Sequence, residues 1–271
     1  MLKIGLVGCG TIGTEICKAI DDGSIDVELY AIYDRKKEHV SNLKSILKKT
    51  EPQVLDIVEM VKNVDLVVEC ASQRAVYEVV PTALHSRCDL MIMSVGALAD
   101  KKLRDMVFNL AKQYDRKVYL PSGAITGLDG LKSASIAKIY SVILTTQKPP
   151  QGFAGAPYII QNNIDLEKIT SITTLFEGTA NEAVKAFPAN VNVAATLSLA
   201  GIGFEDTKVK IIANPALTRN VHEISVEGEF GKFITRVENA PSPTNPKTSY
   251  LAALSAISTL KKIASPVQVG T

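Results

Sequence analysis

Tryptophan is absent from this sequence, and histidine occurs only three times and cysteine four times among 271 residues. No two cysteines form a C-x-x-C pair and no H-E-x-x-H motif occurs, so the spacing gives no support for a metal site or a disulfide framework. We expect the cysteines to be buried, reduced thiols that pack as small hydrophobic side chains. They are Cys9, Cys17, Cys70 and Cys88.

Strong charge and long apolar runs are also missing. The formal net charge is +2, which gives no basis for electrostatic binding of nucleic acid. No apolar stretch approaches the ~20 residues that a transmembrane helix needs. The N-terminus leads directly into a strand-like run and lacks the regions of a signal peptide. We therefore expect a cytoplasmic protein with no nucleic-acid or membrane partner, long enough for two domains.

A strong pattern stands at the beginning of the chain. The apolar run Lys3–Val7 is followed by Gly8-Cys9-Gly10-Thr11-Ile12-Gly13, a G-x-G-x-x-G motif. Apolar residues then recur at helical spacing, and a second apolar run, Val27–Tyr33, ends at Asp34. Strand, glycine turn, helix, strand and acid stand in the order of a dinucleotide-binding unit.

Each glycine of the motif has an expected role. Gly8 permits the tight turn, Gly10 lets the backbone approach a pyrophosphate, and Gly13 lets helix and strand pack closely. The first helical residues, Thr11 and Ile12, would present backbone N–H groups and the positive end of the helix dipole to the phosphates. A glycine-tight turn without a ligand is the alternative interpretation.

The acid at the end of the second run bears on the choice of cofactor. Asp34 would accept hydrogen bonds from the adenosine ribose hydroxyls, which favours NAD. The basic residues Arg35, Lys36 and Lys37 could nevertheless neutralise a 2′-phosphate, so NADP stays possible. The same three residues could equally be the solvated start of a helix.

Two further strand ends are candidates for the cofactor site. The apolar run at residues 65–69 leads into Cys70-Ala71-Ser72, and the run at 90–93 leads into a loop with Gly96 and Ala97. Dinucleotides bind beyond the carboxyl ends of parallel strands, so we expect these small residues to line the site. An ordinary turn between strand and helix is the alternative for the second loop.

The alternation of strands and helices over the first 120 residues predicts an α/β fold with an N-terminal Rossmann domain, a doubly wound parallel sheet over residues 1–122. Residues 123–240 predict a second, α+β domain on a mixed or antiparallel sheet, with a hairpin at 228–231. A helix within residues 241–271 is expected to pack back on the first domain. The Pro/Gly-rich stretch Lys148–Asn163 is expected to be a loop, either a lid or an oligomer contact.

The three histidines differ in their surroundings. His39 lies on a charged helix and His85 near a helix end, and both are expected at the surface. His222 alternates in phase with Ile224 and Val226, which predicts a place on the apolar face of a strand. Arg219 just before it could hold a carboxylate, and an imidazole of pKa ~6.5 could exchange a proton. A satisfied core histidine is the alternative.

Several blocks of the sequence resemble the L-aspartate dehydrogenase family, and together with the glycine motif they span nearly the whole chain. The block that includes His222 is Arg219-Asn220-Val221-His222-Glu223-Ile224, followed by Gly228-Glu229-Phe230-Gly231. The other blocks are Pro121-Ser122-Gly123-Ala124-Ile125, Asn190-Val191-Asn192-Val193-Ala194-Ala195-Thr196 and the segment from Pro241 to Tyr250.

The resemblance implies an NAD- or NADP-dependent enzyme that oxidises L-aspartate to iminoaspartate, which hydrolyses to oxaloacetate and ammonium. It further implies that His222 is the active-site histidine and that Ala124 and Asn192 contact the cofactor. A side chain larger than that of Ala124 would obstruct the nicotinamide, and Asn192 could fix the carboxamide or ribose. Asn192 could instead be the N-cap of a helix that begins at Val193.

For the two substrate carboxylates we expect donors near His222, namely Arg219, Asn220, Lys247 and Thr248. Surface solvation is the alternative for the charged residues, and capping of the last helix is the alternative for Thr248. Since a second-domain sheet commonly presents a face to a partner, we expect a homodimer. The resemblance further implies a functional link to quinolinate synthase, the next enzyme in NAD biosynthesis. Another two-domain reductase, such as a homoserine dehydrogenase or sugar oxidoreductase, and a non-catalytic NAD(H) sensor remain alternatives.

Overall fold

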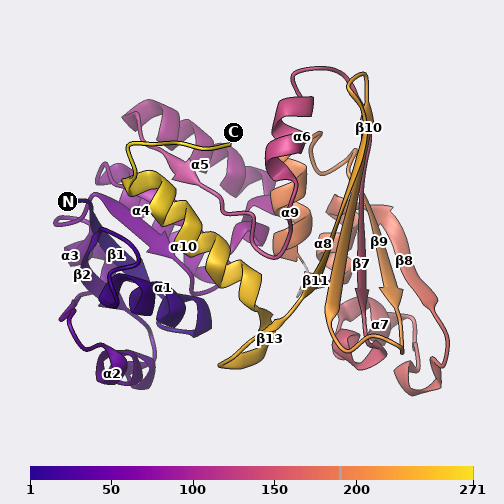
Figure 1. Cartoon of the computed structure of the whole chain (residues 1–271), viewed down its shortest axis with the longest axis horizontal. Helices are drawn as coiled ribbons and strands as arrows, with labels where there is room; N and C mark the ends of the chain where they lie inside the picture. Colours follow the sequence, from indigo (N-terminus) through magenta and orange to yellow (C-terminus); the bar gives the residue numbers. More distant parts are fainter. Residues whose placement is uncertain (189–190, 271) are drawn as a thin grey trace. The chain divides into compact units, whose positions relative to one another are not determined.

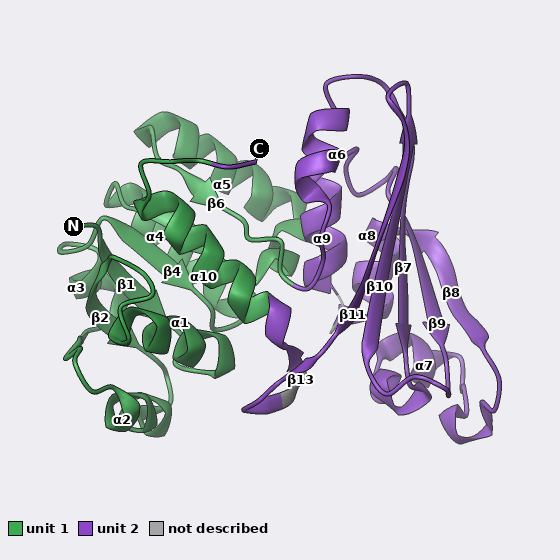
Figure 2. Ribbon diagram, viewed as in Figure 1, with its two compact units in different colours: residues 1–123, 252–268 green, residues 124–251, 269–271 purple. Residues whose placement is uncertain are grey.

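The computed structural model of the chain (Figure 1) describes residues 1–188 and 191–270, and the side chains of all of these except 246 and 247. The chain divides into two compact units (Figure 2). Unit 1 comprises Met1–Gly123 and Ala252–Gln268, and unit 2 comprises Ala124–Leu251 and the residues from Val269 onward. No helix of the described residues is long and apolar enough to span a bilayer.

The sheet of unit 1 is parallel throughout, and its strand order is β3-β2-β1-β4-β5-β6. This is the order of doubly wound dinucleotide-binding folds, and it confirms the predicted Rossmann domain. The strands are β1 (Lys3–Val7), β2 (Glu28–Tyr33), β3 (Gln53–Val54), β4 (Leu66–Glu69), β5 (Asp89–Ile92) and β6 (Val118–Tyr119).

Helices cover both faces of this sheet. They are α1 (Thr11–Asp21), α2 (Lys37–Ile46), α3 (Ile57–Met60), α4 (Gln73–His85), the 3-10 helix η1 (Val95–Ala99), α5 (Lys101–Tyr114) and α10 (Tyr250–Ala264). On α1 the helical spacing of Ile16 and Ile20 places both side chains in the core. Ala256 and Leu260 of α10 belong to the same buried cluster, so the C-terminal helix completes the core of unit 1.

The sheet of unit 2 is mixed, with strand order β11-β10-β7-β9-β8. β7 and β9 are parallel, and the other neighbouring pairs are antiparallel. The predicted hairpin joins β10 and β11 through a turn at Glu229 and Phe230. The strands are β7 (Ile139–Lys148), β8 (Thr173–Thr179), β9 (Lys208–Ala213), β10 (Asn220–Gly228) and β11 (Gly231–Asn239).

One face of this sheet is apolar and lies against the helices of unit 2, which Figure 2 shows in purple. Val142, Leu144, Ile224 and Val226 share this inner face, and each is at most 2% exposed. The helices are α6 (Leu128–Ala134), α8 (Ala180–Ala186) and α9 (Val191–Ala200). Thr179 and Glu182 form a capping box that fixes the start of α8.

One prediction of irregular structure is wrong. The stretch Lys148–Asn163 contains the 3-10 helix η2 (Pro150–Phe153) and helix α7 (Pro157–Gln161). Phe153 is only 2% exposed and packs edge-to-face on Phe187, with ring centroids 5.9 Å apart, so apolar anchors hold this segment in place. The proline-rich segment after residue 240 also has structure, because β12 (Pro241–Ser242) and β13 (Asn245–Ser249) pair there. η3 (Leu166–Lys168) completes the elements.

Candidate active site

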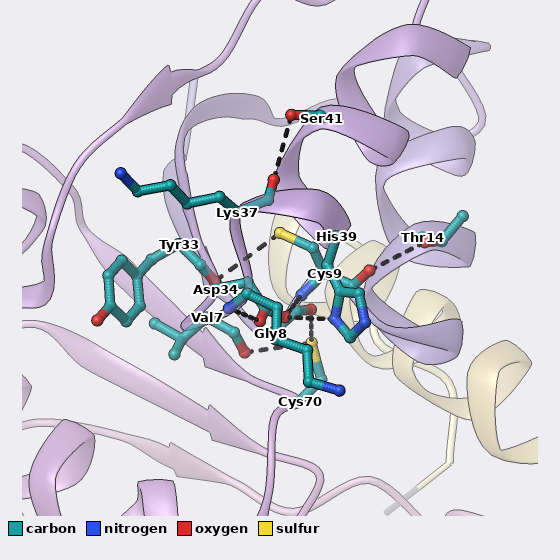
Figure 3. Close-up of polar contacts among 11 residues, drawn as sticks. Val7, Gly8, Cys9, Thr14, Tyr33, Asp34, Lys37, His39, Ser41 and Cys70 are labelled. Carbon is teal, nitrogen blue, oxygen red and sulfur yellow. Dashed lines mark hydrogen bonds and ion pairs between the residues drawn. The ribbon is translucent and has the colours of Figure 1, made fainter.

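The glycine motif forms a loop that the rest of unit 1 surrounds closely (Figure 3). Gly8 has φ +106°, and a Cβ atom on it would lie 2.6 Å from the backbone nitrogen of Ala71. A Cβ atom on Gly13 would lie 2.0 Å from the carbonyl oxygen of Gly8. Both positions therefore need glycine for the protein's own packing.

Gly10 differs from the other two glycines of the motif. Its φ of −79° is open to any residue, and no described atom lies within 4 Å of the Cβ atom that it lacks. It stands immediately before α1, whose first turn directs backbone N–H groups and the positive end of the helix dipole at this space. This space lies next to a helix N-terminus and would be filled by an added methyl group, so it suits a pyrophosphate.

Asp34 lies at the end of β2 and is held in a network of donors (Figure 3). Its Oδ2 accepts from the backbone N–H of Cys9 at 2.8 Å, and its Oδ1 accepts from that of Lys36 at 2.8 Å. His39 is partly exposed, as expected of a surface residue, and its Nδ1 also lies 3.3 Å from Oδ2 of Asp34, a contact that was not predicted. Partial burial raises the pKa of Asp34, but these hydrogen bonds outweigh it and the net pKa is lowered.

Asp34 opens onto a cavity of about 720 Å³ within unit 1. A cavity of this size is in the range of small-molecule and cofactor sites. Seven predicted cofactor residues line it, and so do Lys36, His39, Arg74 and Tyr77. The seven are Gly8, Gly10, Asp34, Arg35, Cys70, Ala71 and Ser72.

The other predicted cofactor residues of unit 1 do not line this cavity in the described structure. Thr11, Ile12 and Gly13 form the start of α1 beside it. Gly96 and Ala97 are buried in η1, where Ala97 is 4% exposed.

Glu69 is a residue that sequence analysis missed. It ends β4 and is fully buried, and its Oε1 accepts from the N–H groups of Ala71 and Ser72 at 2.9 and 3.0 Å. The Ser94 hydroxyl also donates to Oε1, at 2.9 Å, and the Ser94 N–H donates to Oε2 at 3.1 Å. Burial raises the pKa of Glu69, and the four hydrogen bonds oppose that rise. One carboxylate thus joins the loops that follow β4 and β5.

Cys70 also supports the glycine loop. Its thiol lies 3.1 Å from the carbonyl oxygen of Gly8 and 3.5 Å from that of Val7, as a donor (Figure 3). Burial raises the pKa of this thiol, and the nearby Glu69 carboxylate adds to the rise, so the thiol keeps its proton. All four cysteines are free thiols; Cys9, Cys17 and Cys88 are buried, and Cys70 is partly exposed.

His222 lies on the inner face of β10, in phase with Ile224 and Val226 as the alternation predicts, and it is 6% exposed. Its Nδ1 lies 3.0 Å from Oγ1 of Thr146 on the neighbouring strand β7, a second residue that sequence analysis missed. Burial lowers the pKa of His222 to about 4, and the nearby Lys148 charge contributes. The expected value of ~6.5 is therefore wrong, and the imidazole is neutral above about pH 5.

The remaining predicted residues lie at several places in unit 2. Ala124 is 8% exposed, and its carbonyl oxygen accepts from Nδ2 of Asn239 at 3.1 Å. Asn192 is exposed and lies in the first turn of α9, which begins at Val191, so its prediction as the N-cap before Val193 is wrong.

The predicted substrate residues are not equally well placed. Arg219 is exposed three residues before His222, and Asn220 begins β10. Thr248 lies in β13, so the alternative that it caps the last helix is wrong, because α10 begins only at Tyr250. The side chain of Lys247 lies outside the described part of the chain.

Both halves of the chain match known family models. Residues 8–121 match the model described as homoserine dehydrogenase, NAD binding domain. Residues 129–263 match the model described as aspartate dehydrogenase, C-terminal. Together with the parallel sheet, the glycine loop and Asp34, these matches define a two-domain oxidoreductase whose cofactor is a nicotinamide dinucleotide.

Relatives and solved structures are similar over the full length. The chain is 74% identical to the L-aspartate dehydrogenase of Methanococcoides burtonii and 63% identical to that of Methanosarcina acetivorans, each over all of both chains. The crystal structure of aspartate dehydrogenase from Thermotoga maritima shares 31% identity and a TM-score of 0.78, with full coverage of both chains. The chain belongs to the L-aspartate dehydrogenase family, as the sequence blocks predicted.

A more distant structure shares the fold at low sequence identity. The homoserine dehydrogenase of Thiobacillus denitrificans has a TM-score of 0.65 at 14% identity, and it covers 97% of this chain and 73% of its own. The two-unit architecture is therefore shared beyond the family. The alternatives of a homoserine dehydrogenase and of a sensor are not favoured, because the second half matches the aspartate dehydrogenase model.

Proposed function

We propose that the protein oxidises L-aspartate to iminoaspartate with NAD as cofactor, and that iminoaspartate then hydrolyses to oxaloacetate and ammonium. The reverse amination of oxaloacetate is expected under ammonium-rich, reducing conditions. The observation that carries the proposal is the buried His222, fixed by Thr146, in a unit that matches the C-terminal model of the family. The cofactor cavity of unit 1 supports it.

The residues of unit 1 would hold NAD through backbone and carboxylate groups. The space at Gly10 and the N-terminal turn of α1 suit the pyrophosphate, and Asp34 suits the adenosine ribose hydroxyls. When bound, the nicotinamide accepts the hydride from Cα of the substrate. We propose a preference for NAD because the Asp34 carboxylate would repel a 2′-phosphate, although Arg35 and Lys36 line the same cavity. We further propose that Ala124 and Asn192 of unit 2 contact this cofactor.

His222 would act as a general base during the reaction. Hydride can leave Cα only if the amine nitrogen offers a lone pair to the forming C=N bond, so the amine must be unprotonated. If Nδ1 of His222 donates its hydrogen to Oγ1 of Thr146, the lone pair of Nε2 is available to take a proton or to activate the hydrolytic water. The low pKa of His222 keeps this base form populated at neutral pH.

A direct assay tests the proposal. The purified chain is incubated with L-aspartate and NAD, and reduced cofactor is followed by its absorbance. His222→Ala is expected to lose at least about 100-fold in kcat, the lower range for a general base, while it still binds NADH. His85→Ala is the matched control, since His85 is an exposed residue of unit 1. Absence of turnover in the native chain, with either cofactor, would refute the function.

We also propose a homodimer that forms through the outer face of the unit 2 sheet. Ile143 and Ile234 are 38% and 57% exposed and both pair with Ser225, so the two isoleucines flank this serine in one row across three strands. The ion pair of Arg236 with Glu223, at 3.7 Å, lies beside this row and presents both signs of charge. A second copy related by a two-fold axis would meet the row with its own row and each charge with its opposite.

Sedimentation of the native chain and of Ile234→Glu tests the dimer. The native chain is expected to sediment as a dimer and the variant as a folded monomer, because the introduced carboxylates would face each other in an apolar contact. A native monomer, or a variant that remains dimeric, would contradict the proposal.

The place of the reaction in the cell is likewise a proposal. The resemblance to the family supports a cytoplasmic enzyme whose iminoaspartate is consumed by quinolinate synthase in NAD biosynthesis. Complementation tests this: the gene should restore growth without nicotinate to a host that lacks its own source of iminoaspartate. A host that still requires nicotinate, despite active enzyme in its extract, would contradict it.

A further inference from the structure

Lys148 is the C-terminal residue of β7 and shares the inner face of the sheet with the active-site histidine. Along β7 the residues Leu144, Thr146 and Lys148 alternate onto the same face. His222 pairs directly with Thr146, so Lys148 is its diagonal neighbour across the strand pair. Diagonal neighbours have Cα atoms about 7–8 Å apart, which a lysine side chain spans easily.

The segment after β7 folds over Lys148. A Cβ atom on Gly152 would lie 3.3 Å from Cβ of Lys148, so η2 packs against the aliphatic stem. The ammonium lies 5.9 Å from the ring centroid of Phe153, which is itself buried. The side chain is partly buried, and the packing of its stem limits its freedom to move away from His222.

We propose that Lys148 binds a carboxylate of the dicarboxylic substrate next to His222. This assignment rests on the proposed function. A partly buried ammonium gains more from a carboxylate than a fully solvated one does, because the interaction is less screened. Arg219 is a weaker candidate for this role, because it is exposed.

The electrostatics of the pair agree with the geometry. Burial lowers the pKa of Lys148 to about 8, so the side chain is mostly charged at neutral pH but only at a cost. The positive charge contributes to the lowered pKa of His222, in agreement with their places on one face of the sheet. A bound carboxylate would stabilise the charged ammonium while the imidazole stays neutral and able to accept a proton.

Steady-state kinetics of Lys148→Met, in the full-length protein, tests the assignment. Methionine keeps the length of the stem and removes the charge. KM for L-aspartate is expected to rise roughly tenfold or more, the loss expected for one charge-assisted hydrogen bond, while KM for NAD changes less than about twofold. Lys148→Arg is expected to restore most of the affinity because it restores the charge. Lys132→Met, on the exposed face of α6, is the matched control.

Thermal unfolding separates this role from a structural one. Lys148→Met is expected to remain folded, because methionine keeps the packing of the stem against η2. If the variant does not fold, Lys148→Gln takes its place in the same measurements. An unchanged KM for L-aspartate in a folded, charge-free variant would overturn the assignment.

Binding of substrate analogues tests the role of Lys148 independently of the proposed enzyme activity. Succinate, with two carboxylates, should protect the native chain against thermal unfolding better than propionate, with one, and Lys148→Met should lose that difference. The measurement needs no turnover. An inactive native chain would therefore refute the proposed function alone, and equal loss of succinate and propionate binding would refute the role of Lys148.

Discussion

The substitution Gly10→Ala adds one methyl group and should weaken cofactor binding with little effect on the stability of the fold. The variant Gly10→Ala places a Cβ atom where no described atom lies within 4 Å, at a backbone φ of −79° that alanine adopts freely. Alanine stiffens the unfolded chain, which favours folding by about 0.4–1 kcal/mol. It is also a slightly poorer N-cap than glycine, which costs a similar amount. We therefore expect a net change in stability within about 0.5 kcal/mol.

The effect on the cofactor should be much larger. The added methyl group would occupy the space in which the backbone meets the pyrophosphate, so at least one charge-assisted hydrogen bond would be lost. Such a bond contributes about 1.5–3 kcal/mol, which corresponds to a rise in Kd of roughly 10- to 150-fold. Fluorescence titration with NADH measures this directly, and a melting curve of the cofactor-free protein measures stability.

Gly13→Ala is the matched control, because the same methyl group there meets the protein itself. Its Cβ atom would lie 2.0 Å from the carbonyl oxygen of Gly8, a backbone atom that cannot rotate away. We expect this variant to lose stability by more than the about 1–3 kcal/mol of ordinary overpacking. Native NADH affinity in Gly10→Ala, or a native melting temperature in Gly13→Ala, would refute the assigned roles of the loop.

Three further outcomes follow from the contacts of the two units. Asp34→Ser should raise the ratio of kcat/KM for NADP to kcat/KM for NAD by roughly tenfold or more, because it removes a carboxylate that would repel the 2′-phosphate. An unchanged ratio would contradict the role of Asp34. Glu69→Leu leaves three N–H groups and one hydroxyl without their acceptor, so it should lower the free energy of unfolding of unit 1 by about 3–5 kcal/mol in urea unfolding. Glu69→Gln keeps one acceptor oxygen and should cost less. Equal free energies of unfolding for the two variants would contradict this. The pKa of His222 falls from 6.5 to about 4 on folding. Between these two pH values the imidazole is protonated in the unfolded chain but neutral in the folded chain. Stability should thus decrease as the pH falls from 6.5 to 4, by at most about 3 kcal/mol, and His222→Gln should show a correspondingly shallower pH dependence in urea unfolding.

The architecture of this chain is readable from its sequence because periodicity and glycine spacing are local signals. The helical spacing on α1 and the strand alternation around His222 both predict the faces that are buried in the structure. The parallel pairing of the strands in unit 1 follows from the alternation of strands and helices along the chain. These features depend on neighbours in the sequence, so no knowledge of distant contacts is needed.

The parts that sequence reasoning missed depend on contacts between distant residues. Glu69 looks like the polar end of an apolar strand, and only its distance from Ser94 shows that it joins two loops. His39 looks solvated until the end of β2 places Asp34 beside its ring. The pKa of His222 was expected to be ordinary, because burial cannot be quantified from alternation alone.

The segment after β7 shows a different reason for failure. Its proline and glycine content predicts a loop, yet Phe153 inserts into a cluster of aromatic rings and fixes it. The two aromatic residues of this segment, Phe153 and Tyr158, were the available signal. The same segment covers Lys148, so the wrong prediction there also concealed the candidate substrate cation.

The division of the chain has a consequence for its biosynthesis. Unit 1 is discontinuous, since Ala252–Gln268 belong to it although more than a hundred residues of unit 2 come first. As the chain emerges from the ribosome, the sheet that carries the glycine loop lacks the cover of Ala256 and Leu260 until residues 124–251 of unit 2 have been synthesised. A truncation that removes only the last helix should therefore expose apolar surface on the nucleotide domain, and nascent chains stalled just before that helix should be good clients for chaperones.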